Sequence, residues 1–251
     1  MSELWEKDNF INLNIPYIFN REIIEYDLKE AGFSICREFK LLDNEKIDTL
    51  NKLDKEARHR RIGIYQRDDK EFKENLKEGF SRARELFIKE NNITQNDIIS
   101  IKKDALFICK KCEYQKIGKY LNFRPKNTYS SYIRLTKNLE LYYSKESLDI
   151  KGIGDDKLSY HENYIISFLK TYFNKMESED RQSVLKYVRR YIDKYKNKEL
   201  GAGYYRTFDN RSIFEFIEDT NDYVITESIK DNIDIRYNLF NIFIKLIKIP
   251  L

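Results

Sequence analysis

Two aspartates, Asp27 and Asp104, have the residue type and the sequence setting that divalent-metal chemistry requires. Asp27 ends an apolar run that begins at Ile23, and Asp104 stands at a charged tip between the apolar runs 98–101 and 105–108. The first setting predicts the end of a strand, and the second predicts a hairpin with the carboxylate at its turn. Phosphoryl transfer uses two divalent ions about 3.5–4 Å apart, bridged by carboxylates from different chain segments. We therefore expect the two carboxylates to face each other across neighbouring strands.

These two segments and two later ones resemble, in their order, the palm domain of template-dependent DNA polymerases of families A and B. The resemblance covers about residues 20 to 155. Motif A of those families is a strand, an aspartate, a short loop and a helix, and residues 26–35 resemble it. Motif C is a hairpin that presents metal-binding carboxylate, and residues 101–107 resemble it. Family B palms then carry a lysine-tyrosine element and a Lys-Gly step, which residues 126–129 and 149–153 resemble in that order.

The resemblance implies a template-dependent nucleotidyltransferase, similar to a DNA polymerase, that uses Mg²⁺ or Mn²⁺. Its implied partners are a primer-template nucleic acid and nucleoside triphosphates. Asp27 and Asp104 would be the catalytic metal ligands, with the main-chain carbonyl of Leu28 as a third ligand. Because 251 residues leave little room for complete fingers, thumb and exonuclease, we expect a minimal or split polymerase of a phage or mobile element. Other polymerase or replisome subunits would then complete it.

Motif C departs from the family pattern and keeps other interpretations open. Family B has two aspartates there and family A has an Asp-Glu pair, whereas Asp104 is followed by Ala105 and preceded by two lysines. One alternative is a catalytically inactive palm-fold module that binds nucleic acid or protein, such as a phage replication accessory or anti-defence protein. Another is that Asp27 caps a turn and Asp104 is a solvated hairpin residue.

The densest basic segment lies between the two aspartates, at residues 58–67. In a polymerase this interval supplies positive charge to the incoming triphosphate, and the arginine fork binds phosphate oxygens in pairs. The alternative is a solvated basic turn that pairs with neighbouring carboxylates. Gly63 within it either permits a close approach of the backbone or marks a turn. The candidate triphosphate-binding residues are Arg58, Arg60, Arg61 and Arg67.

Three residues after the hairpin are candidates for binding nucleic acid, by the family B resemblance. Lys126 would supply a point charge for a backbone phosphate, and Tyr129 would pack on a sugar or a base. Lys151, in the Lys-Gly step, has the same implied role. The alternative is a strand with ordinary surface residues after Pro125.

Composition favours a folded protein in a reducing compartment. The chain is 41% hydrophobic and 14% aromatic, which is enough for a sizeable core. A net charge of +4 does not by itself require a nucleic-acid partner. Three cysteines argue against a disulfide framework. No apolar run reaches the roughly 20 residues that span a bilayer, and the first residues are polar, so we expect a cytoplasmic protein without a membrane partner.

Periodicity predicts an α+β fold, with a mostly antiparallel sheet and flanking helices over residues 1–155 and an α-helical region over 156–251. The resemblance implies that the sheet is palm-like. Expected strands lie at about 22–27, 97–102 and 105–109, and expected helices at about 44–54 and 69–91. The longer helix carries an apolar stripe at steps of three and four residues. Further strands are expected near 120–124, 131–135, 139–143 and 147–151, as an extension of the same sheet. A last helix is expected at about 230–248.

Overall fold

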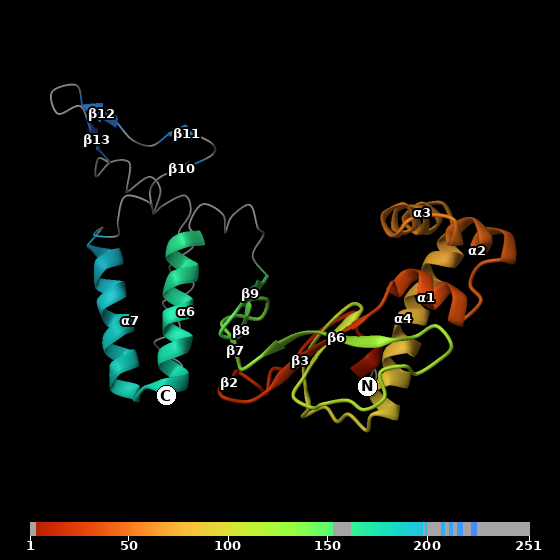
Figure 1. Cartoon of the computed structure of the whole chain (residues 1–251), viewed down its shortest axis with the longest axis horizontal. Coiled ribbons are helices and arrows are strands. Elements are labelled where there is room, and N and C mark those ends of the chain that lie inside the picture. Colours follow the sequence, from red (N-terminus) through yellow and green to blue (C-terminus); the bar gives the residue numbers. More distant parts are fainter. Residues whose placement is uncertain are drawn as a thin grey trace. The chain divides into compact units, whose positions relative to one another are not determined.

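The computed structural model divides the chain into two compact units (Figure 1). The first comprises Met1–Ile15 and Arg21–Tyr129, and the second comprises Pro16–Asn20 and Ser130–Leu251. The structure describes residues 4–152 and 162–197, residue 199, and four short strands beyond residue 206. The predicted domain boundary near residue 155 and the predicted last helix at about 230–248 lie outside the described residues.

Five antiparallel strands form the sheet of the first unit, in the order β1-β4-β5-β3-β6. Their bounds are β1 Asn9–Ile11, β3 Ile23–Leu28, β4 Ile98–Lys102, β5 Ala105–Ile108 and β6 Phe123–Tyr129. β4 and β5 form the predicted hairpin. The second strand of the hairpin pairs with β3, so that Asp27 lies opposite Ala105. This strand order places the end of β3 beside the hairpin turn.

A short 3-10 helix and four α-helices complete the first unit. Their bounds are η1 Leu4–Glu6, α1 Ala31–Glu38, α2 Asn44–Asn51, α3 Lys55–Asp68 and α4 Lys70–Glu90. The basic segment 58–67 lies inside α3 and is not a turn. α3 begins where the Asp54 carboxylate accepts a hydrogen bond from the main-chain N–H of Ala57 at 2.8 Å, which satisfies one of the free donors of the first turn.

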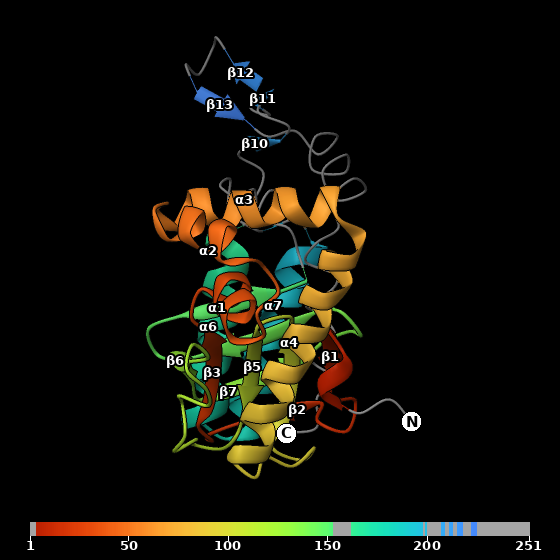
Figure 2. The ribbon, with the colours of Figure 1, turned by 90° about the vertical axis from the view of Figure 1, so that its right-hand side faces the viewer.

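The apolar stripe of α4 packs against the sheet, as its periodicity predicts. The ring of Phe87 lies 5.3 Å from that of Tyr26 on β3 and 4.4 Å from that of Phe123 on β6, and Figure 2 shows α4 in front of β5. Ile24, Tyr26 and Leu28 belong to the same core as this helix. Because side chains alternate along a strand, Glu25 and Asp27 take the other positions of β3.

The second unit has its own four-stranded sheet, in the order β2-β7-β8-β9. Its strands are β2 Tyr17–Ile18, β7 Ser131–Arg134, β8 Glu140–Tyr143 and β9 Leu148–Lys151. The expectation that these strands extend the first sheet is wrong, because β7 pairs with β2 and β8, whereas β6 pairs with β3. The Lys-Gly step ends β9: Gly152 has φ +102°, and a Cβ there would overlap the Asn138 carbonyl, so only glycine fits.

Two helices follow this sheet, α6 Glu162–Ser178 and α7 Arg181–Lys196. The ring of Tyr143 stacks on Phe173 of α6 at 4.8 Å, and the Glu177 carboxylate accepts hydrogen bonds from the hydroxyls of Ser130 and Ser131. Four short strands beyond α7 form two antiparallel pairs: β10 Thr207–Phe208 with β11 Arg211–Ser212, and β12 Glu215–Ile217 with β13 Asp222–Val224. The predicted α+β class is confirmed. None of the helices that the structure describes is both long and apolar enough to cross a bilayer.

Two helical glycines give a paired test of this packing. Gly63→Ala on α3 should stabilise the first unit by about 0.5–1 kcal/mol, because no atom lies within 4 Å of a Cβ there and alanine loses less backbone entropy than glycine in a helix. Gly79→Ala on α4 should instead destabilise it by about 1–3 kcal/mol, because the new Cβ would overlap Ile35 of α1.

Urea unfolding followed by the fluorescence of Trp5, the single tryptophan, measures both changes. Trp5 reports on this unit because its carbonyl accepts a hydrogen bond from Arg84 of α4 at 2.8 Å. Equal effects of the two substitutions would contradict the packing of α4 on α1.

Candidate functional site

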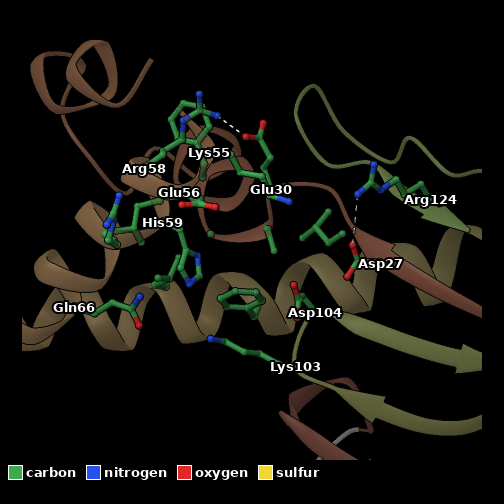
Figure 3. Close-up of a pocket in the computed structure, with 18 of the residues that line it drawn as sticks. Asp27, Glu30, Lys55, Glu56, Arg58, His59, Gln66, Lys103, Asp104 and Arg124 are labelled. Carbon is green, nitrogen blue, oxygen red and sulfur yellow. Dashed lines mark hydrogen bonds and ion pairs between the residues drawn. The ribbon is translucent and has the colours of Figure 1, made fainter. Parts of the chain in front are cut away.

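Asp27 and Asp104 come together at one end of the first sheet. Asp27 is the fifth residue of β3, opposite Ala105 of β5 and Arg124 of β6. Asp104 follows Lys103, whose φ of 55° makes the tight hairpin turn. The main-chain N–H of Leu28 donates a hydrogen bond to the Asp104 carbonyl at 3.1 Å. Asp27 and Asp104 both line one cavity (Figure 3).

Arg84 of α4, which the sequence analysis missed, fixes the hairpin turn. Its guanidinium is buried, with 1% of its surface exposed, and donates hydrogen bonds to the carbonyl of Lys103 at 2.7 Å and to that of Trp5 at 2.8 Å. It also pairs with the Asp8 carboxylate at 3.1 Å. Burial lowers the pKa of Arg84, and the bond to Asp8 opposes that shift. In the sequence, Arg84 stands within the apolar stripe of α4, between Ala83 and Phe87. That position could have indicated that its side chain is buried.

The cavity has a volume of about 730 Å³, within the range of small-molecule sites. It lies between the ends of β3 and β6, the hairpin turn and helices α1, α3 and α4, and Figure 3 shows the charged side chains that surround it. Basic side chains outnumber acidic ones among its lining residues. The basic residues are Lys55, Arg58, His59, Arg60, Lys103, Arg124 and Lys126, and the acidic residues are Asp27, Glu30, Glu56 and Asp104.

The electrostatics of the aspartate pair suit a cation. Burial raises the pKa of Asp27, and the nearby Asp104 carboxylate raises it further. Lys126 and Arg124 act in the opposite direction, and the Arg124 guanidinium lies 4.0 Å from the Asp27 carboxylate. A carboxylate whose charge is disfavoured by burial and by a nearby carboxylate is stabilised when a divalent ion binds beside it.

A magnesium ion at Asp27 and Asp104 would have to complete its shell from solvent and substrate. No group of three or more His, Cys, Asp or Glu residues that could hold a metal occurs in the described part of the chain. Mg²⁺ is typically held by one or two carboxylates together with water and substrate phosphates. Leu28, predicted as a third ligand through its carbonyl, also lines the cavity.

The four arginines predicted to bind triphosphate have different environments. Arg58 and Arg60 line the cavity, and Arg61 and Arg67 do not. The Arg58 guanidinium is occupied by the Glu30 carboxylate at 2.6 Å and by the carbonyls of Leu50 and Leu53, so it fixes α3 to the start of α1. Arg60 is exposed and forms no ion pair with any residue that the structure describes.

Arg61 is exposed on the same helix. Arg67 is also exposed, and its Nε pairs with the carboxylate of the adjacent Asp68 at 2.8 Å. Of the four arginines, Arg60 is therefore the one that both lines the cavity and has a free guanidinium.

The predicted nucleic-acid residues on β6 converge on Glu25, a buried carboxylate that the sequence analysis missed. Glu25 accepts hydrogen bonds from Asn127 Nδ2 at 2.6 Å, from the Tyr129 hydroxyl at 3.2 Å and from Lys126 Nζ at 3.5 Å. Lys126 is half exposed and lines the cavity. Tyr129 is buried and supports Glu25. Lys151 lies in the second unit, where its ammonium pairs with Asp149 at 3.3 Å.

Comparison with known proteins adds the family of the whole chain. A family model described as bacteriophage PBS1 gene 130 protein matches residues 1–251. The chain belongs to this family. No curated protein matches it. Membership in the bacteriophage PBS1 gene 130 protein family confirms the predicted phage character, while the polymerase resemblance depends on the residues described above.

The raised pKa of Asp27 predicts how stability changes with pH. Between the ordinary aspartate pKa of about 3.9 and its raised folded value, the folded state binds more protons than the unfolded state, so stability falls as pH rises. Asp27→Asn removes this penalty. Without divalent metal, the variant should therefore gain stability over the wild type as pH rises from about 4 to 7.

Asp97 provides a control of opposite sign. Burial acts to raise its pKa, but hydrogen bonds from the Thr94 hydroxyl and main-chain N–H, at 2.7 and 2.8 Å, leave it lowered. Its contribution to stability is present above the unfolded pKa and is lost as pH falls, so Asp97→Asn should be destabilising at neutral pH. Urea unfolding at about pH 4 and pH 7 measures the stability of both variants relative to the wild type. The same change with pH in both variants would contradict the opposite pKa shifts of Asp27 and Asp97.

Proposed function

We propose that this phage protein is a template-dependent nucleotidyltransferase of the DNA polymerase type, which adds a nucleotide from a triphosphate to a primer end. The observation that carries the proposal is the placement of Asp27 and Asp104 in one cavity with free cationic side chains. Carboxylates for metal and cations for phosphate are the two requirements of phosphoryl transfer, because its catalysis consists mainly of positioning and electrostatic stabilisation.

The residues of the cavity divide the work in this proposal. Asp27 and Asp104 hold Mg²⁺ or Mn²⁺, which would neutralise charge that develops on the reacting phosphate. Arg60 binds the triphosphate, in place of the larger set of arginines expected from the sequence. Lys126 pairs with Glu25 and lines the cavity, and in this proposal its ammonium contacts a backbone phosphate near the primer end. Arg124 balances the charge of Asp27 before substrate arrives.

Two predicted roles change with their environments. Arg58 has its donors occupied by Glu30 and two carbonyls, so we propose that it positions α3 and does not bind phosphate. Tyr129 is buried against Glu25, so we propose that it holds the network from which Lys126 extends. Lys151 remains a proposed nucleic-acid contact from the second unit.

A second function, a palm-like module without catalysis, is favoured by one observation. The hairpin turn presents a single carboxylate, flanked by Lys102, Lys103 and Ala105. In this case the cavity would bind a phosphate-bearing ligand, and the chain would serve as a replication accessory or anti-defence protein.

Primer extension distinguishes the two functions. With a primed template, nucleoside triphosphates and Mg²⁺ or Mn²⁺, the wild-type chain should extend the primer. Asp27→Asn and Asp104→Asn keep the size of each side chain and remove the charge that holds metal, so each should reduce extension at least about 100-fold. The control is Asp48→Asn, which changes an exposed carboxylate of α2 outside the cavity and should extend as the wild type does.

A wild-type protein that binds triphosphate but extends nothing with either metal would overturn the catalytic proposal and leave the binding module. Loss of extension in the Asp48→Asn control would show that the assay reports general destabilisation and not the site.

Triphosphate affinity tests the role given to Arg60. Arg60→Ala should weaken the binding of a fluorescent nucleoside triphosphate about tenfold, the effect of losing one charge-assisted hydrogen bond of about 1.5 kcal/mol. Ca²⁺ in place of Mg²⁺ permits an equilibrium titration without turnover. Arg67→Ala removes the same side chain from the same helix outside the cavity and should leave the affinity unchanged. Equal losses in the two variants would assign the effect to the general charge of α3.

A further inference from the structure

A second cavity of about 550 Å³ lies on the first unit, at the C-terminal end of α1. Its lining includes Arg37 and Lys40 from the end of α1, and Lys119 and Tyr120 from the loop before β6. None of these three cationic side chains pairs with a carboxylate in the part of the chain that the structure describes. Unpaired cations around a cavity favour an anionic ligand.

The single carboxylate of this cavity is already occupied. Glu38 accepts hydrogen bonds from the main-chain N–H groups of Lys119 at 3.3 Å and Tyr120 at 2.6 Å. A Cβ at Gly118 would lie 2.6 Å from the Glu38 carboxylate, so the loop approaches α1 this closely because position 118 is glycine. Glu38 therefore holds the loop that carries Lys119 and Tyr120. Its carboxylate oxygens already accept hydrogen bonds from two main-chain N–H groups of that loop.

The ring of Tyr120 contacts two of the cations, Arg37 and Lys119. The Arg37 guanidinium lies 3.8 Å from the ring centroid of Tyr120, within cation–π range, and Lys119 Nζ lies 5.2 Å from the same ring. Both cations also lower the pKa of the Tyr120 hydroxyl, Lys119 more than Arg37. The positive charges of Arg37 and Lys119 therefore lie close together at the Tyr120 ring without a bound ligand.

The ring of Phe33 contacts one cation from the lining of each cavity. The ring of Phe33 has the Arg58 guanidinium at 4.4 Å and the Arg37 guanidinium at 5.4 Å. Phe33 and Arg58 line the first cavity, and Arg37 lines the second. Cations and rings therefore alternate in the order Arg58 on α3, Phe33 and Arg37 on α1, and Tyr120 and Lys119 in the loop before β6.

We propose that this second cavity binds the phosphodiester backbone of single-stranded nucleic acid, with Arg37, Lys40 and Lys119 as the phosphate contacts. A basic groove with interleaved aromatic side chains is the arrangement by which proteins hold single strands without reading sequence. The choice of nucleic acid as the ligand rests on the proposed function, in which a template strand must leave the first cavity. A free phosphate has the same recognition chemistry but does not need the series of cations and rings that runs from Arg58 to Lys119.

The test measures binding of a fluorescent oligothymidylate of about 12 nucleotides, a length within the site sizes of single-strand-binding folds. Fluorescence anisotropy is recorded in EDTA without triphosphate, so that metal chemistry at Asp27 and Asp104 does not contribute. The variant is the double substitution Lys40→Gln with Lys119→Gln. The matched control is Lys73→Gln with Lys77→Gln, which removes the same charge from two exposed positions of α4 outside both cavities.

The cavity variant should bind at least about tenfold more weakly at low salt than the control. The slope of log K against log salt should also become shallower by about 1.4, because each single-strand phosphate contact contributes about 0.7. Inorganic phosphate is titrated in parallel as the probe for a simple anion site.

Equal affinities and slopes for the cavity variant and the control would overturn the proposal. It would also be overturned if inorganic phosphate bound the wild type and not the variant while oligothymidylate affinity stayed the same, since the site would then hold a free anion. A protein that shows the expected loss in EDTA but extends no primer would keep this site and lose the proposed catalysis. Primer extension by the wild type, with equal strand affinity in the cavity variant and the control, would keep the proposed catalysis and overturn this second site.

Discussion

The first unit depends on one buried cation. Arg84 connects the N-terminal segment, α4 and the β4–β5 turn through the carbonyls of Trp5 and Lys103 and the carboxylate of Asp8. A buried guanidinium without such acceptors would cost several kcal/mol, so the three acceptors restrict where the turn can lie. Because the Leu28 N–H bonds to the Asp104 carbonyl, the same constraint fixes Asp104 relative to the end of β3. The aspartate pair is thus positioned by a residue of α4, in another segment of the chain.

Two carboxylates on β3, Glu25 and Asp27, have opposite electrostatic environments. Glu25 is 2% exposed and has its charge compensated by an ammonium, an amide and a hydroxyl. Asp27, two residues later on the same strand, has the Arg124 guanidinium at 4.0 Å and a pKa raised by burial and by Asp104. A carboxylate with satisfied partners stabilises its surroundings, whereas one held near a like charge is destabilising until a ligand compensates it. The second kind is the one expected at a functional site.

The periodicity of the sequence predicts the helices and strands of the first unit, but it does not predict which of their side chains contact each other. The stripe of α4 and the hairpin around Asp104 follow from spacing alone. β6 was placed too early, near 120–124, because Pro125 and the exposed polar residues after it hide a strand that lies at the edge of the sheet. The arginines of 58–67 were visible as charge, but nothing local shows that Glu30 and two carbonyls take up Arg58. Such pairings join segments far apart in the sequence, and they depend on strand order. The second sheet was missed for the same reason.

On the proposed function, Ala105 would limit the metal chemistry of the site. It is 7% exposed and lies directly opposite Asp27, at the position where the family A pattern carries a second acidic residue. A carboxylate there would face Asp27 as a cross-strand pair of like charges, which destabilises a sheet. With alanine, the pair supplies two carboxylates to a cavity in which lysines and arginines are more numerous. On the proposed function, the ion must then take further ligands from water and from the triphosphate. Metal and nucleotide binding should therefore be coupled, each raising the affinity for the other by the same factor.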